Sequence, residues 1–150
     1  MILCQDFKCV PAIAPQVRKD DAAWTATAID TKGFEYLTIL FNIGATDIAF
    51  ASLSVTHSDT DSSYGPLTGA VFGTSADIAG NTSSLPGADQ SDTMLRVDID
   101  LKTAKRFVKV AGAAGNGSTG TYLSAVGLLS RANSVPTTAA QLGCAQVLRV

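Results

Sequence analysis

The feature that most constrains the fold is a strict alternation of apolar and charged residues within short segments. Residues 95–101 are the clearest case, where Leu95, Val97, Ile99 and Leu101 alternate with Arg96, Asp98 and Asp100. Successive side chains of a β-strand point to opposite faces, so this pattern predicts a strand with one buried face and one face in water. A helix would place apolar residues three or four positions apart instead.

Further segments are rich in β-branched, aromatic and small residues, and Gly, Pro, Ser and Asp separate them. Ala, Thr, Ser and Gly fill 64 of the 150 positions, which favours strands and turns over long helices. We expect hairpins between 34–42 and 48–57 and between 94–101 and 106–111, with 112–120 as a flexible hairpin loop. A short helical turn is expected at 137–142. The predicted strands cover residues 24–30, 34–42, 48–57, 67–72, 94–101, 106–111, 121–130 and 145–150.

These strands predict an all-β fold, an antiparallel β-sandwich or barrel-like domain of about seven to eight strands. The length of 150 residues suits one domain. Residues 1–21 contain two prolines and show no sustained periodicity, so we expect an extended N-terminal arm followed by a single β domain over 22–150. Residues 58–93 are rich in Ser, Asp, Gly and Pro, and we expect a long projecting loop there.

Charge is unevenly distributed along the chain, although the net charge is only −2. Residues 33–95 contain seven acids and no Lys or Arg, whereas residues 96–150 contain seven basic residues and two acids. Either the two regions neutralise each other within one fold, or acidic loops of one copy meet basic strands of another. The slightly acidic balance argues against direct contact with nucleic acid.

The N-terminal residues lack the basic and long apolar regions of a secretory signal, and no apolar run is long enough to span a bilayer. We therefore expect synthesis and retention in the cytosol, unless lysis releases the protein, with no membrane partner. Cys4, Cys9 and Cys144 form an odd and sparse set, so unpaired thiols are expected rather than a disulfide framework or a zinc site.

Motifs for catalysis or metal binding are weak. His57 is the only histidine and has no nucleophile elbow to serve, so a solvated or hydrogen-bonded role at a strand end is expected. The glycine-rich residues 115–120 lack the Lys-Ser/Thr step of a phosphate loop and indicate a turn. Residues 59–70 carry Ala70 where a calcium loop requires Glu. We therefore predict no catalytic residue, no cofactor, no metal and no enzyme activity.

Four segments and the C-terminal end carry a resemblance to a known family. Residues 30–44, 53–59, 98–110 and 119–133, with Pro136 and the ending AQLGCAQVLRV, resemble small proteins encoded among the head genes of tailed bacteriophages, cyanophages and prophages. The resemblance implies a capsid decoration, or cement, protein of β-sandwich type. It also implies a homotrimer that binds the major capsid protein on the outer surface of the virion head, at threefold and quasi-threefold positions.

A decoration protein needs adhesive surfaces rather than a reactive group. We expect contacts to a neighbouring subunit or to the shell from four apolar residues of the arm and from three basic strand residues. These are Ile2, Leu3, Phe7 and Val10, together with Lys105, Arg106 and Lys109. The alternative is a phage tail or receptor-binding β module, in which residues 58–93 would recognise a host surface ligand.

Overall fold

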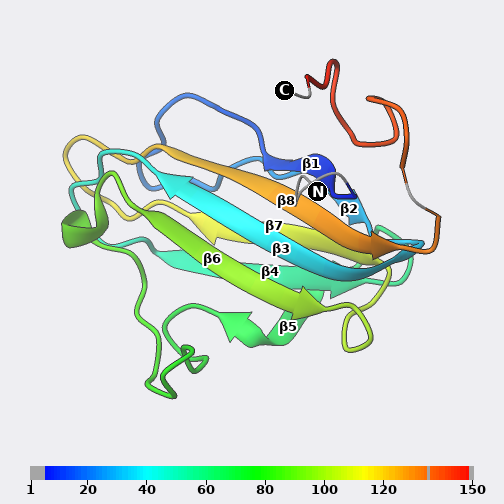
Figure 1. Ribbon diagram of the computed structural model, residues 1–150. Helices are drawn as coiled ribbons and strands as arrows, with labels where there is room; N and C mark the ends of the chain where they lie inside the picture. The colour runs from blue at the N-terminus through cyan, green and yellow to red at the C-terminus, as the bar shows by residue number, and fades with distance from the viewer. Residues whose placement is uncertain (1–5, 135, 149–150) are drawn as a thin grey trace.

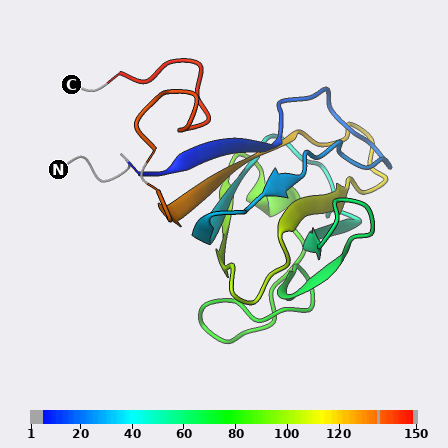
Figure 2. The same ribbon diagram turned by 90° about the vertical axis from the view of Figure 1, so that its right-hand side faces the viewer.

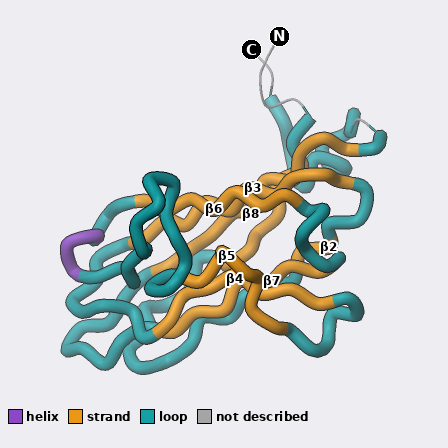
Figure 3. Tube along the Cα trace, turned by 90° about the horizontal axis from the view of Figure 1, so that it is seen from below, coloured by secondary structure: helices purple, strands orange, loops and turns teal. Residues whose placement is uncertain are grey.

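The computed structural model describes residues 6–134 and 136–148 and shows two antiparallel sheets packed face to face (Figures 1 and 3). Sheet I has the order β1-β8-β3-β6 and sheet II the order β2-β7-β4-β5. The all-β antiparallel sandwich is confirmed. The strands of sheet I are β1 (Lys8–Ile13), β8 (Leu123–Ala132), β3 (Phe34–Ile43) and β6 (Met94–Asp100). Those of sheet II are β2 (Ile29–Asp30), β7 (Phe107–Ala113), β4 (Ser52–Ser58) and β5 (Gly65–Val71), and one 3-10 turn, η1, spans Ala88–Gln90.

The order of the strands is that of an eight-stranded jelly roll, a fold of two four-stranded sheets. Among the described strands, every connection between consecutive strands crosses from one sheet to the other, except the one from β4 to β5. The first strand, β1, pairs only with the last, β8. The fold is therefore held together by contacts between segments far apart in the sequence.

The hairpin expectations are wrong for this reason. Residues 34–42 and 48–57 correspond to β3 and β4, which lie in different sheets, as do β6 and β7, and β7 and β8. The chain between β3 and β4 crosses the end of the sandwich, where Phe50 is only 2% exposed and its ring lies 4.9 Å from that of Trp24. Burial of Phe50 favours this crossing over a tight turn, and strand periodicity alone does not reveal it.

The core lies between the two sheets and is filled by the inward side chains of alternating strand positions. The Phe41 ring, from β3, meets the Phe72 ring edge-on, with centroids 6.1 Å apart. This contact joins sheet I to the residue that follows β5 of sheet II. Fully buried side chains from both sheets surround the centre, including Leu37, Ile39, Val55, Val108 and Leu129.

The expected extended arm over residues 1–21 is in part a strand of the sandwich. Lys8–Ile13 forms β1 and pairs with β8, with Val10 opposite Gly127. A Cβ atom at Gly127 would lie 2.9 Å from both Val10 and Ile29, so glycine lets these side chains pack over the strand. Pro11 interrupts the segment, and a proline argues against a strand except at the edge of a sheet, so the strand was not predicted.

The outer edge of β1 is covered by two other segments. Thr27 donates its backbone N–H to the Ala12 carbonyl at 2.9 Å, and Cys9 donates its N–H to the Leu142 carbonyl at 2.8 Å. Such cover protects a strand edge from pairing with foreign chains. The strand predicted over 24–30 is therefore wrong for residues 24–28. These residues connect the two sheets, because Thr27 bonds to Ala12 of sheet I and the Trp24 N–H donates to the Gly112 carbonyl of sheet II.

The remaining expectations concern the loop and the tail. Residues 58–93 contain β5 and η1, and Figure 1 shows the chain that follows β5 extending beyond the sheets. The helical turn expected at 137–142 is present, with the Leu142 N–H bonded to the Thr138 carbonyl at 3.0 Å. The strand expected over 145–150 is wrong for 145–148, which are not part of a sheet, and 149–150 lie outside the described residues.

Candidate interaction surface

The outward side of sheet I carries an apolar face, which we define as Cys9, Pro11, Leu40, Val126 and Leu128. The strand registers place Val126 between Pro11 and Leu40, and Leu128 beside Cys9. Val126 is 45% exposed, although its position on a sheet exposed to water would ordinarily favour a polar residue. Pro11 is also exposed, and Cys9, Leu40 and Leu128 are partly exposed. Contiguous apolar surface of this kind marks sites of interaction.

The outward side of sheet II is different. Its β4 positions are Ser52, Ser54 and Thr56, and the facing β7 positions include Lys109 and Ala111. The Thr56 hydroxyl donates to the Lys109 carbonyl at 2.8 Å, so it already has a partner within the sheet. The two outward faces therefore differ in polarity, and sheet I is the one suited to a dry contact.

Charged groups border the apolar face at its ends. Arg131 pairs with Glu35 at 3.1 Å and lies 5.7 Å from the centre of the Tyr36 ring. On β6, Arg96 pairs with Asp98 at 3.0 Å. An apolar centre with a polar rim is the usual composition of a protein interface.

The C-terminal segment, residues 136–148, lies on the same side of the molecule. Figures 2 and 3 show this segment extending outward from sheet I, away from sheet II, next to β1. Its side chains Val147 and Leu148 are 40% and 88% exposed.

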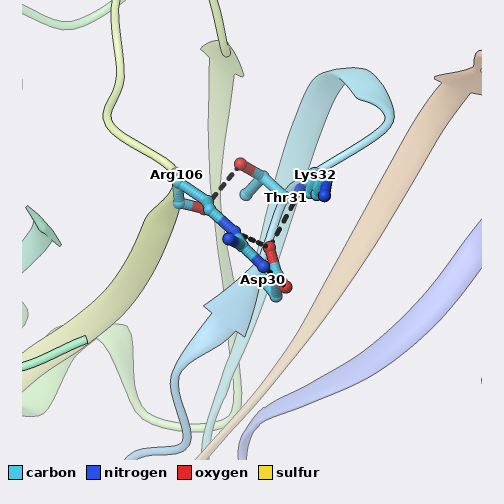
Figure 4. Close-up of polar contacts among 4 residues, drawn as sticks. All are labelled: Asp30, Thr31, Lys32 and Arg106. Atoms are coloured by element: carbon cyan, nitrogen blue, oxygen red, sulfur yellow. Dashed lines mark hydrogen bonds and ion pairs between the residues drawn. The ribbon is translucent and has the colours of Figure 1, made fainter. Parts of the chain in front are cut away.

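The predicted basic contact residues have partners within the chain. Arg106 forms two hydrogen bonds to the Asp30 carboxylate, at 2.9 and 2.7 Å, and its carbonyl accepts from the Thr31 hydroxyl at 2.7 Å (Figure 4). The Asp30 carboxylate also accepts the Lys32 N–H at 3.1 Å. The guanidinium of Arg106 is the main cause that lowers the pKa of Asp30 to about 2.

Lys105 and Lys109 meet the acid-rich region of the sequence. Lys105 pairs with Asp59 at 3.0 Å, and the Lys109 ammonium lies 5.5 Å from the centre of the Tyr64 ring. Tyr64 in turn donates its hydroxyl to Asp61, and burial together with this contact raises the pKa of Tyr64 to about 12. The acidic and basic regions therefore neighbour each other within one fold. Contact between the acidic loops of one copy and the basic strands of another stays a prediction.

The predicted apolar arm residues separate in the structure. Val10 packs against the core of its own domain, and Phe7 is half-buried just before β1. Ile2 and Leu3 lie outside the described residues. Sequence reasoning missed the apolar face, although the alternation of Val126 and Leu128 with small residues in 121–130 was a usable signal.

The glycine-rich residues 115–120 are held in place by two carboxylates. The loop expected over 112–120 is therefore neither part of a hairpin nor free of contacts with the rest of the chain. Asp47 accepts the backbone N–H groups of Ser118 and Thr119, at 2.6 and 2.7 Å, and Asp20 accepts the Gly117 N–H at 2.9 Å. These hydrogen bonds lower the pKa of Asp47 to about 2. The amides that resemble an anion site thus bind the chain's own anions.

We predict that Asp47→Ala destabilises the fold, because it leaves the two amides without their acceptor and frees the crossing from β7 to β8. The urea midpoint should fall clearly below that of the unmodified chain. Asp89→Ala is the matched control, because the Asp89 side chain accepts only from the exposed Gln90 amide and its loss should change the midpoint little. Equal midpoints for the two variants would contradict the prediction.

Asp47 and the Asp30 carboxylate that pairs with Arg106 predict acid sensitivity. Asp30 and Asp47 have pKa values lowered from 3.8 to about 2, so their ionised forms stabilise the folded state at pH above about 4. This contribution is lost as the pH falls from about 4 to about 2, because the carboxylates then take up protons. The urea midpoint should fall over this range, and less steeply in the double variant Asp30→Asn, Asp47→Asn.

The other candidate groups have structural positions. His57 accepts the Lys105 N–H at its Nδ1 atom, at 3.2 Å, which confirms the expectation of a hydrogen-bonded histidine. Cys144 is a free thiol, as expected, whereas Cys4 lies outside the described residues. Within residues 6–134 and 136–148, no three His, Cys, Asp or Glu side chains cluster as metal ligands would. The same residues include no helix with the length and apolar character needed to cross a bilayer.

A groove of about 600 Å³ opens between the edge strands β5 and β6. Residues 69–72 and 75–78 form one wall, and residues 96–98 of β6 form the other. Phe72 and Val97 supply apolar surface, and Asp77 and Asp98 supply acidic groups. One wall of the groove thus belongs to the region 58–93 that the sequence marked as a projecting loop.

Comparisons with known proteins identify the fold. No protein-family model matches the sequence, and no curated protein matches it either. Among solved structures, the chain is similar to the crystal structure of the SPBc2 prophage-derived protein YomS, with a TM-score of 0.52 and 13% sequence identity. The match covers 84% of this chain and 94% of that one, so the likeness extends over nearly the whole sandwich.

Proposed function

We propose that this chain is a structural protein of a bacteriophage particle, a decoration protein that binds the major capsid protein on the outside of the head. The observation that carries the proposal is the apolar face of sheet I, which has 45% of Val126 exposed while the outward side of sheet II is polar. The sequence resemblance to phage head proteins supports it. The jelly roll, which is common in viral capsid proteins, and the fold shared with a prophage-derived protein are consistent with it.

The physical requirements of this role are met by a surface rather than by a reactive centre. A rigid body is supplied by contacts between strands distant in the sequence, and a dry contact area is supplied by the apolar face with its charged rim. We accordingly propose that the protein is not an enzyme, that it is made in the host cytoplasm, and that it joins the virion surface as a homotrimer.

The test is electron microscopy of purified particles, combined with a count of copies per particle. A decoration protein should be present in hundreds of copies distributed over the head. In solution, light scattering should give the mass of a trimer, three times the chain mass of 15.5 kDa, or that of two trimers joined together. Absence from the outside of the head would overturn the proposal.

The groove favours a second candidate, a tail or receptor-binding module. Residues 75–78 and 83 border the groove and belong to the projecting region, and acidic and aromatic side chains near an open groove suit a host glycan or surface protein. A few copies at the tip of the tail would identify this function. The location on the particle therefore distinguishes the two candidates in one experiment.

A further inference from the structure

We infer that β6 is a second contact surface, at which two copies of this chain pair edge to edge about a two-fold axis. The inference concerns the isolated chain and does not depend on the proposed attachment to a phage head. Its first basis is the position of β6 at the end of sheet I, with β3 on one side and no described strand on the other. The groove lies along this open side, at residues 96–98.

The hydrogen bonds at both ends of β6 show which backbone groups face the open side. The Leu101 N–H donates to the Glu35 carbonyl, and the Ile43 N–H donates to the Thr93 carbonyl, both at 3.0 Å. Because bonding positions of an antiparallel strand alternate, the odd-numbered residues of β6 bond to β3. The N–H and C=O groups of Arg96 and Asp98 therefore point away from β3, toward the open edge of sheet I, where another strand could pair with them.

The charges on β6 are self-complementary in one register. Arg96 and Asp98 are the two central outward positions, and their side chains are 65% and 59% exposed. If two β6 strands pair antiparallel with Val97 opposite Val97, each Arg96 lies directly opposite an Asp98 of the other copy. This arrangement also sets the outward backbone groups of Arg96 against those of Asp98, as hydrogen bonding requires.

The neighbouring registers are less favourable. A shift of the pairing to the next bonded register in one direction places Arg96 opposite Arg96. A shift in the other direction places Arg96 opposite Asp100 but sets Asp98 opposite Asp98, so only the register centred on Val97 pairs opposite charges without a like-charge pair. The sequence of charges therefore selects the register centred on Val97. Each copy would contribute two opposite charges to a group of four, in addition to the pair that Arg96 and Asp98 already form within one chain at 3.0 Å.

The inward side of the strand fits the same contact. Leu95 and Val97 are partly buried and pack against the core, but each keeps exposed surface at the sheet edge. Pairing would place the two Val97 side chains together and cover part of this surface. Charged side chains on an edge strand can also prevent pairing with other chains. The test must therefore show whether the charges of β6 attract a second copy or repel it.

The experiment uses the full chain with Cys4, Cys9 and Cys144 replaced by serine, after circular dichroism has shown that this background folds. In it, Val97→Cys places two thiols at a non-hydrogen-bonded pair, where the Cα atoms are about 4.5 Å apart, within the range of a disulfide. Mild oxidation should convert the chain to a covalent dimer of twice 15.5 kDa. Met94→Cys is the control, because Met94 would face Asp100 and lie about 20 Å from its own copy.

Charge changes complete the test. Arg96→Asp added to Val97→Cys should reduce the rate of cross-linking about tenfold or more, because it sets like charges opposite each other. The double exchange Arg96→Asp, Asp98→Arg should restore the rate, which a misfolded variant could not do. Failure of Val97→Cys to cross-link, equal cross-linking by Met94→Cys, or no restoration by the double exchange would each overturn the inference. None of these results would alter the test of the sheet I face.

Discussion

Val126→Asp is expected to abolish binding to the phage head while leaving the fold intact. Val126 lies between Pro11 and Leu40 at the centre of the apolar face and is 45% exposed, so the isolated chain can hydrate a carboxylate there. In the complex the same carboxylate would be removed from water without a partner, which is costly. We expect affinity to fall about 100-fold or more, as for a central residue of an interface. To measure the affinity, phage particles that lack the protein are mixed with each variant, and the fraction of occupied sites on the head is determined.

The matched control is Ala111→Asp, which introduces the same charge at an exposed, outward position on sheet II. We expect it to bind the head like the unmodified chain, because the outward side of sheet II is already polar. Full occupancy by Val126→Asp, or loss of binding in both variants, would show that the apolar face is not the attachment surface.

Phe41→Ala is expected to have the largest effect on stability. The Phe41 side chain is fully buried, and its ring meets Phe72 edge-on across the sandwich. Truncation of a buried phenylalanine costs about 3–5 kcal/mol in lost burial and cavity formation. This is a large part of the roughly 5–15 kcal/mol that stabilises a typical domain. Urea unfolding followed by fluorescence of the buried Trp24 would measure the loss.

Phe41→Leu should lose less, because leucine fills part of the space that alanine leaves empty. Val126→Ala should change the free energy of unfolding by less than about 1 kcal/mol, because Val126 is 45% exposed and lies outside the core. If Phe41→Ala were no more destabilising than Val126→Ala, the contact between the two sheets would not centre on Phe41.

The local part of this fold could be predicted from the sequence. The aromatic and β-branched residues of 34–42 and the alternation in 94–101 correspond closely to β3 and β6, and the turn residues between strands were recognised from Gly, Pro and Ser. Periodicity states which residues of one strand share a face. It does not state which sheet a strand joins, and for this reason the expected hairpins were wrong.

The first strand shows a second limit. Lys8–Ile13 includes a proline, and its partner β8 is more than a hundred residues away, so nothing local predicts the pairing. Val10 was expected at a surface because the segment resembled an arm, whereas opposite Gly127 it packs inward.

The candidate surface was predicted only in part. Uneven charge suggested contact between the acidic and basic regions, and the pairs of Lys105 with Asp59 and of Arg131 with Glu35 confirm it within one chain. The apolar face depends on three strands being adjacent, with Pro11, Leu40 and Val126 in one row. Their adjacency is a property of the topology, and no single segment reveals it.

The pairing of β1 with β8 also governs how the chain can fold during its synthesis. Sheet I stays incomplete until residue 132, the end of β8, has emerged from the ribosome, because β1 and β3 both pair with β8. At bacterial translation rates of about 5–20 residues per second, the N-terminal strand waits for roughly ten seconds without its partner. Truncated or stalled chains would expose the unpaired edges of β1 and β3, an arrangement that favours aggregation. Sheet I can therefore close only once its last strand is available.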